Sequence, residues 1–91
     1  MGILDDKAVD DALARGSWHR EGKEIVRVAE RDDFAAALAF VNEVGLLAEG
    51  ANHHPDIDIR WNRVTLRLST HSEGGITDKD LTLAAAIDDL G

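Results

Sequence analysis

The segment DIDIRWNRVTLRL, residues 56–68, decides the fold because apolar and polar side chains alternate along it in two successive runs. A period of two is typical of a β-strand with one buried face. The alternation restarts after Asn62, which predicts an antiparallel hairpin that turns near Asn62 and Arg63. The apolar residues of the two runs are Ile57, Ile59, Trp61, Val64, Leu66 and Leu68.

A long helix is expected before this hairpin, over residues 32–49. Either aspartate of the pair at 32–33 can cap its start, and Gly50 can close its end. Apolar residues recur along it at helical spacing, which predicts one face buried against the sheet. The residues expected on that face are Phe34, Ala37, Leu38, Val41, Val44 and Ala48.

Three further segments carry secondary structure. Residues 4–14 have the pattern of a short helix with acidic first turns, which Gly16 can end. Residues 17–30 predict two short strands around a turn at 21–23, and residues 77–90 predict a last helix that Thr77 opens. The expected order along the chain is therefore α-β-β-α-β-β-α.

Two hairpins and three helices in this order predict an α+β fold: a four-stranded antiparallel sheet with the helices packed on one face. The length of 91 residues suits a single domain, residues 1–91. A chain this small covers its apolar surface poorly, so we expect a homodimer or homotetramer, assembled through the sheet edge or a helix face.

Charge and composition disfavour several classes of partner. The formal net charge is −8, which disfavours binding to nucleic acid or to an anionic membrane. The chain contains no cysteine, so disulfides, thiolate catalysis and cysteine-based zinc sites are excluded. We find no apolar run close to a membrane span and no signal-like N-terminus, and we expect a cytoplasmic protein.

Three of the four histidines stand near one another in the expected fold, and they allow three interpretations. His53 and His54 precede Pro55, and His71 ends the second strand of the hairpin. They could bind a metal with Glu49 or Asp80, although adjacent residues rarely point to one centre. They could instead be polar loop residues, as Asp80 could belong to a helix-capping box begun by Thr77. The third interpretation is proton transfer, because histidine titrates near neutral pH.

The expected hairpin favours a shared pocket for these histidines. His54 and Pro55 lie just before the start of one strand, and His71 lies just after the end of its partner. Because the hairpin turns near Asn62, those two points meet at the same end of the sheet. We therefore expect His71 to return to the vicinity of His53 and His54.

These residues also carry a resemblance to a known family. The segments EGANHHP (49–55), TLRLSTH (65–71) and GGITDKDLTLA (74–84) resemble the pterin-4a-carbinolamine dehydratases, also called 4a-hydroxytetrahydrobiopterin dehydratases. Trp18 and the segment DDFAAALAFVNEV (32–44) fit the family's earlier segments, so the resemblance covers nearly the whole chain. The sequence departs from the family at Ala29 and Arg31, where aromatic residues are frequent, and at Lys79, where arginine is frequent.

The resemblance implies a hydro-lyase that converts 4a-hydroxytetrahydrobiopterin, or a related pterin, into quinonoid dihydropterin and water. It implies neither a metal nor a redox cofactor. The catalytic residues that it implies are His53, His54, His71 and Asp80. The pterin-binding residues that it implies are His53, His54, Pro55, Thr70, His71, Ser72 and Glu73.

The chemistry of the reaction suits these side chains. Hydroxide leaves poorly, so an imidazolium that protonates it lowers the barrier, and the N5 proton needs a base. We assign the acid role to His53 and His71, and we expect His54 to bind and orient the pterin. Asp80 can stabilise the charged form of a neighbouring histidine, and Glu49 is a second candidate for that task.

A non-enzymatic role is the alternative interpretation. The resemblance extends to a family whose members in animals also act as dimerisation partners of a transcription factor. A chain of this fold could therefore be a dimerisation or protein-binding module that regulates another protein. The three histidines favour catalysis, because a pure scaffold does not need them at one edge of the sheet.

Overall fold

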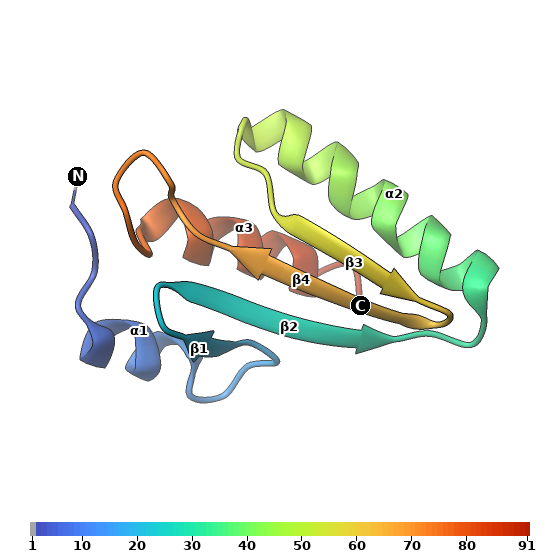
Figure 1. The fold of residues 1–91 in the computed structure, drawn as a ribbon, viewed down its shortest axis with the longest axis horizontal. Coiled ribbons are helices and arrows are strands. Elements are labelled where there is room, and N and C mark those ends of the chain that lie inside the picture. Colours follow the sequence, from blue (N-terminus) through green and yellow to red (C-terminus); the bar gives the residue numbers. More distant parts are fainter. Residues whose placement is uncertain (1) are drawn as a thin grey trace.

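The computed structural model describes residues 2–91 and has the expected order of helices and strands (Figure 1). Each helix begins at an acidic or hydroxyl side chain that accepts a backbone N–H: Asp5, Asp33 and Thr77. The elements are α1 (Asp6–Leu13), β1 (His19–Glu21), β2 (Glu24–Glu30), α2 (Phe34–Ala51), β3 (Asp56–Arg60), β4 (Arg63–Leu68) and α3 (Asp78–Asp88).

The four strands form one antiparallel sheet in the order β1-β2-β4-β3. β4 is central and pairs with both β2 and β3: Leu66 lies opposite Arg27 on one side and Ile57 on the other. The alternation in residues 56–68 therefore predicted the β3–β4 hairpin correctly. This register also brings the start of β3 and the end of β4 to the same end of the sheet (Figure 1).

The core lies between the sheet and the helices. Side chains at alternate positions of β2 and β4 point into it and are fully or almost fully buried, whereas the opposite face of the sheet carries mainly charged residues. Trp18, which precedes β1, is also buried. The core residues contributed by β2 and β4 are Ile25, Ala29, Val64, Leu66 and Leu68.

The buried face of α2 is rotated from the one expected from sequence. Ala37, Val44 and Ala48 are buried as expected, but Phe34 and Leu38 are 45% and 42% exposed. Phe40 takes their place in the core, where the Arg27 and Arg31 guanidinium groups lie over its ring, 5.6 and 4.1 Å from the centroid. An apolar pattern spread over more than one face of a helix does not reveal which part of it is buried.

Two positions in turns also differ from the expectation. Gly50 lies inside α2, and the helix is ended by Asn52, whose φ of 49° is left-handed. Trp61 is not a core aromatic: it lies in the turn between β3 and β4 with a φ of 53° and is 67% exposed. The strand ends at Arg60, one residue before the alternation does, so Trp61 leaves the face that Ile57 and Ile59 share.

The expectation that no segment approaches a membrane span is wrong for α2 by the criteria of length and composition. Its 18 residues, with a mean hydropathy of 1.4, have the length and composition of a helix that could cross a membrane. A core helix meets the same criterion, and four α2 residues pack in the core of this fold. The apolar character of α2 is thus used in part inside the fold.

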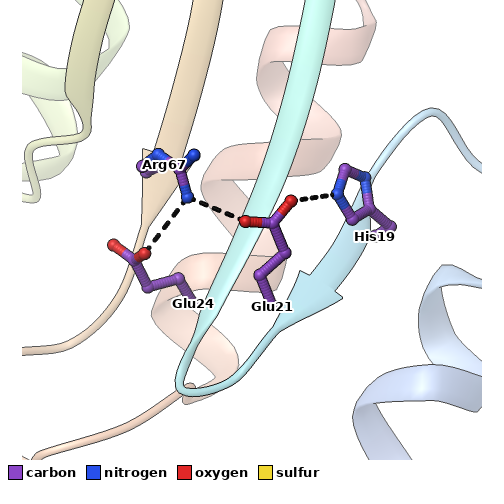
Figure 2. A network of polar contacts seen from close by, with 4 residues as sticks. All are labelled: His19, Glu21, Glu24 and Arg67. Carbon is purple, nitrogen blue, oxygen red and sulfur yellow. Dashed lines mark hydrogen bonds and ion pairs between the residues drawn. The ribbon is translucent and has the colours of Figure 1, made fainter.

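A polar network crosses the open face of the sheet near the β1–β2 turn (Figure 2). The Arg67 guanidinium on β4 donates to Glu21 (3.1 Å) and to Glu24 (3.3 Å), and His19 lies 2.7 Å from the second oxygen of Glu21. The hydrogen bond from His19, followed by that from Arg67, lowers the pKa of the Glu21 carboxyl. The fourth histidine of the chain is therefore paired on this face, among side chains other than those that line the cavity described next.

Candidate active site

The end of α2 sets the direction of the two adjacent histidines. Asn52, in its left-handed conformation, donates its N–H to the Glu49 carbonyl (3.2 Å), and His53 donates its N–H to the Ala48 carbonyl (3.1 Å). This pair of bonds is the Schellman arrangement, which satisfies the last carbonyls of the helix and reverses the chain. The reversal places His53 and His54 directly before β3, at the end of the sheet where β4 finishes (Figure 1).

The loop after β4 supplies the third histidine. Thr70 and Gly75 form an isolated antiparallel bridge, and the Thr70 carbonyl accepts the N–H groups of Glu73 and Gly74 at 2.9 Å. Gly74 has a φ of 78°, a left-handed conformation that glycine adopts without strain. The loop is therefore tightly held at its base, and His71 stands at its exposed tip.

The three histidines line one cavity of about 270 Å³. The hairpin thus brings together His53, His54 and His71, as the position of its turn predicted. Thr70 and Ser72, also expected at the site, line this cavity too. The remaining lining residues are Asn52, Ser69 and Lys79.

Four other expected site residues lie around this cavity rather than in its lining. Asp80 is fully buried behind His53, and Glu49 pairs with His54. Glu73 lines an adjacent hollow of about 260 Å³ at the start of α3. Pro55 is half-buried and lines none of the principal cavities within residues 2–91.

Asp80 joins the loop, the last helix and His53. Its Oδ1 lies 2.5 Å from Nε2 of His53, and its Oδ2 accepts the Thr70 hydroxyl (2.8 Å) and the Thr77 backbone N–H (2.9 Å). The bond from Thr77 is one half of a capping box at the start of α3. The capping interpretation of Asp80 is confirmed, and the same carboxylate also contacts a histidine of the cavity, because its two oxygens have separate partners.

This arrangement orients His53. A carboxylate accepts hydrogen bonds only, so the short contact with Asp80 places a proton on Nε2 of His53. Nδ1 then carries the lone pair of the neutral ring, and it has no hydrogen-bond partner in the described part of the chain. No side-chain atom that is sealed from solvent lacks a partner among residues 2–91, so Nδ1 reaches solvent. His53 is anchored through one nitrogen and free to exchange a proton through the other.

The other two histidines have different surroundings. His54 Nε2 lies 2.5 Å from Glu49, but both side chains are more than half exposed. His71 is exposed, and its ring makes no hydrogen bond or ion pair with any residue in the described chain. The cavity therefore combines a histidine with buried carboxylate support, a histidine with exposed support and a histidine without any.

Sequence reasoning did not assign three of the lining residues to the site. Asn52 could have been suspected as a left-handed helix cap, because asparagine tolerates that conformation. Ser69 had no signal beyond its place at the end of β4. Lys79 lines the histidine cavity, the hollow beside Glu73 and a more apolar groove of about 350 Å³ between α2 and α3. His53 also lines that groove, so the histidine and the lysine stand between a polar and an apolar space.

No group of three or more histidine or acidic side chains within residues 2–91 is placed to hold a metal ion. Of the carboxylates first considered as ligands, Glu49 points its oxygen at His54 and Asp80 at His53. Nitrogen and oxygen ligands that bond to each other do not converge on one centre. What the arrangement can do is bind a small polar molecule and exchange protons with it.

Comparison with known proteins defines the class to which this fold and site belong. Residues 3–90 match the family model described as pterin 4 alpha carbinolamine dehydratase. A relative from Chloroflexus aurantiacus is 53% identical over 99% of this chain and 98% of its own length, and one from Acidobacterium capsulatum is 52% identical over 99% of both. Each is named "Putative pterin-4-alpha-carbinolamine dehydratase". The chain belongs to the pterin-4a-carbinolamine dehydratase family.

Solved structures share this fold. A chain from Brucella melitensis, described as a transcriptional coactivator/pterin dehydratase, superposes with a TM-score of 0.91 and 32% identity over 98% of both chains. A pterin dehydratase-like protein described as a RuBisCO assembly factor of the alpha-carboxysome superposes with a TM-score of 0.70, covering 84% of this chain and 90% of its own. Its identity is 24%, so that likeness concerns the fold alone.

Proposed function

We propose that this protein catalyses the dehydration of 4a-hydroxytetrahydrobiopterin, or of a closely related pterin 4a-carbinolamine, to the quinonoid dihydropterin and water. The observation that carries the proposal is the cavity in which His53, His54 and His71 meet, with a buried carboxylate behind His53. Membership of the dehydratase family supports the substrate class. The cavity of about 270 Å³ adjoins the groove of about 350 Å³ between α2 and α3. The two spaces together have the volume of a small-molecule site, about 300–1,000 Å³.

The reaction needs one proton donated and one removed. The C4a–O bond breaks and the oxygen leaves as water after gaining a proton, while the N5–H proton is lost and the C4a=N5 double bond forms. A protonated imidazole serves the first step, and the N5 proton passes to water or to a histidine of the site that is neutral in that turnover. Each well-placed group of this kind contributes about 10²–10⁴-fold to the rate.

We assign protonation of the leaving hydroxyl to His53 and His71. Asp80 holds Nε2 of His53, and His53 lines the cavity, so its Nδ1 is the ring nitrogen left to meet a ligand. His71 is unpaired in the described chain and is free to turn toward a ligand. His54, held by Glu49 at the rim, is assigned to binding and orienting the pterin.

The direct test is turnover of freshly generated 4a-hydroxytetrahydropterin, followed by ultraviolet absorbance with and without a chelator. We expect the wild-type protein to accelerate dehydration well beyond the spontaneous rate, with no loss on chelation. His71→Ala should remove most of the acceleration and leave the fold intact, since its ring makes no hydrogen bond or ion pair in the described chain. A folded wild-type protein that leaves the spontaneous rate unchanged refutes the proposal.

Self-association is the second function that a specific observation favours. β3 is an edge strand, so one row of its backbone groups is unpaired among residues 2–91, and α2 runs beside it (Figure 1). Exposed apolar side chains lie along this border: Ile57 on β3, Trp61 in the following turn, and Phe34 and Leu38 on α2. An edge strand bordered by exposed apolar side chains can pair with a second copy of the chain, as a homodimer or within a homotetramer.

A regulatory binding role of the monomer is the remaining alternative. It draws on the printed description of the solved structure from Brucella melitensis, which names a transcriptional coactivator. The turnover assay separates it from catalysis: a folded chain with the intact cavity and no turnover favours the binding role.

A further inference from the structure

The Thr70 hydroxyl is used inside the fold rather than in the cavity. Thr70 lies immediately before His71 and is 3% exposed. Its Oγ1 lies 2.8 Å from Oδ2 of Asp80 and 2.7 Å from Oγ1 of Thr77. The residue lines the cavity, but both hydrogen bonds of its hydroxyl go to buried groups.

The chemistry of these groups fixes the direction of the hydrogen bonds. The Thr70 hydroxyl donates its single proton to Oδ2 of Asp80, so it cannot also donate to Thr77. The Thr77 hydroxyl must then donate to Thr70, and it in turn accepts the Lys79 backbone N–H at 3.3 Å. A directed chain therefore runs from the first turn of α3 through Thr77 and Thr70 to the carboxylate.

We infer that Thr70 is a positioning residue for His53, acting through Asp80. Two donors, the Thr70 hydroxyl and the Thr77 N–H, occupy Oδ2 and leave Oδ1 aimed at Nε2 of His53. This fixes the carboxylate plane and hence the ring nitrogen that carries the proton. The inference rests on the proposed function, and it adds a role for the Thr70 hydroxyl to the place of Thr70 in the cavity lining.

Thr70 also links two catalytic elements. Its backbone belongs to the loop that carries His71, where its N–H donates to the Gly75 carbonyl at 2.9 Å. Its side chain holds Asp80 on α3, which holds His53 at the end of α2. One residue thus sets the position of His71 relative to His53. An acid pair that acts on one hydroxyl requires this spacing to be constant.

The test compares Thr70→Val, which removes the hydroxyl at nearly constant shape, with Thr70→Ser, which keeps it. We expect Thr70→Val to lower kcat by about 10- to 100-fold, the range seen when an outer hydrogen bond that orients a histidine ligand is lost. KM, and the affinity for a non-reacting dihydropterin measured by fluorescence, should change less than about threefold. Thr70→Ser should restore most of kcat. A raised KM with unchanged kcat would show direct substrate binding and overturn the inference.

A spectroscopic measurement does not depend on turnover. With ¹⁵N-labelled histidine, we expect the wild-type His53 to be the Nε2–H form when neutral and to lose that preference in Thr70→Val, while His19 is unchanged. In the wild type, the Thr70 hydroxyl proton should be protected from exchange, which tests the bond even if Thr70→Val fails to fold. A rapidly exchanging hydroxyl, or an unchanged His53 in folded Thr70→Val, overturns the inference. Absence of turnover by the wild type refutes only the proposed function.

Discussion

The site geometry predicts in detail what happens to the hydrogen bonds of Asp80 when this residue is replaced by asparagine. The carboxylate accepts on both oxygens, whereas an amide has one acceptor and one donor group. The NH₂ group cannot face Thr77, whose backbone N–H is a fixed donor at 2.9 Å. It must therefore face His53, which can respond by accepting at Nε2 and moving its proton to Nδ1. Asp80→Asn thus keeps the helix cap and moves the proton of the neutral His53 ring from Nε2 to Nδ1.

The magnitudes follow from what is lost. Three charge-assisted bonds become neutral ones, each weaker by about 1 kcal/mol. Relief from burying a charge offsets part of this loss, so we expect unfolding to become easier by about 1–3 kcal/mol. That corresponds to a fall in Tm of about 4–8 °C per kcal/mol for a domain of this size. Activity should fall much further, by about 10²–10⁴-fold, because neither an imidazolium nor the correct neutral form is supported.

The assay is dehydration of 4a-hydroxytetrahydropterin by the folded variant, with Glu49→Gln as the matched control. Both substitutions turn a carboxylate that touches a histidine at 2.5 Å into an amide, but the Glu49–His54 pair is exposed. Exposed pairs contribute little, so we expect the control to lose less than about threefold in kcat. Wild-type turnover by Asp80→Asn, or an equal loss in Glu49→Gln, would show that the buried Asp80 has no special role in orienting His53.

Three further predictions concern stability and assembly. Glu21→Gln should lower the free energy of unfolding at neutral pH, because the lowered pKa of Glu21 means that its ionised carboxyl stabilises the fold. The difference should begin to shrink as pH falls below the ordinary value of 4.5 and disappear below the lowered pKa; a pH-independent difference in urea unfolding would contradict this. Asp88→Ala should lower the free energy of unfolding by about 2 kcal/mol, since it leaves the largely buried Arg27 and the Trp18 indole N–H without their acceptor at 2.9 Å. The neighbouring Asp89→Ala should lower it by less than about 0.5 kcal/mol, and equal losses in thermal melts would refute the prediction. Ile57→Lys on the exposed edge of β3 should lower the oligomeric state in sedimentation without loss of helix content, and an unchanged mass would exclude that edge as the interface.

The helices and strands that could be predicted from sequence are those with a clear local pattern of apolar and polar residues. The alternation around Asn62 fixed both the hairpin and its register, and so the return of His71 to His53 and His54. The rotation of α2 could not be predicted, because Phe34, Leu38 and Phe40 are all apolar and only the packing of Phe40 beneath Arg27 and Arg31 distinguishes them. The same limit applies to Trp61, whose turn conformation removes it from the strand pattern.

The meeting of the three histidines could be predicted from sequence, but the contacts between the site residues could not. The resemblance named Asp80, and the capping pattern begun by Thr77 explained it separately, but sequence alone presented these as alternatives. The structure gives each oxygen of Asp80 its own partners, one of them 27 residues away in sequence. The inward direction of the Thr70 hydroxyl depends on the loop that returns at Gly75, a contact between segments that has no local sequence signal.

The most direct test of catalysis by the clustered histidines is kcat and KM for dehydration by the four single histidine-to-alanine variants. We expect His53→Ala and His71→Ala to lose about 10²–10⁴-fold in kcat, and His54→Ala mainly to raise KM. His19→Ala serves as the internal control, because His19 pairs with Glu21 on the open face (Figure 2), and it should retain full activity. Full activity in His53→Ala and His71→Ala, or a loss in His19→Ala as large as theirs, would contradict proton transfer by the histidines of the cavity.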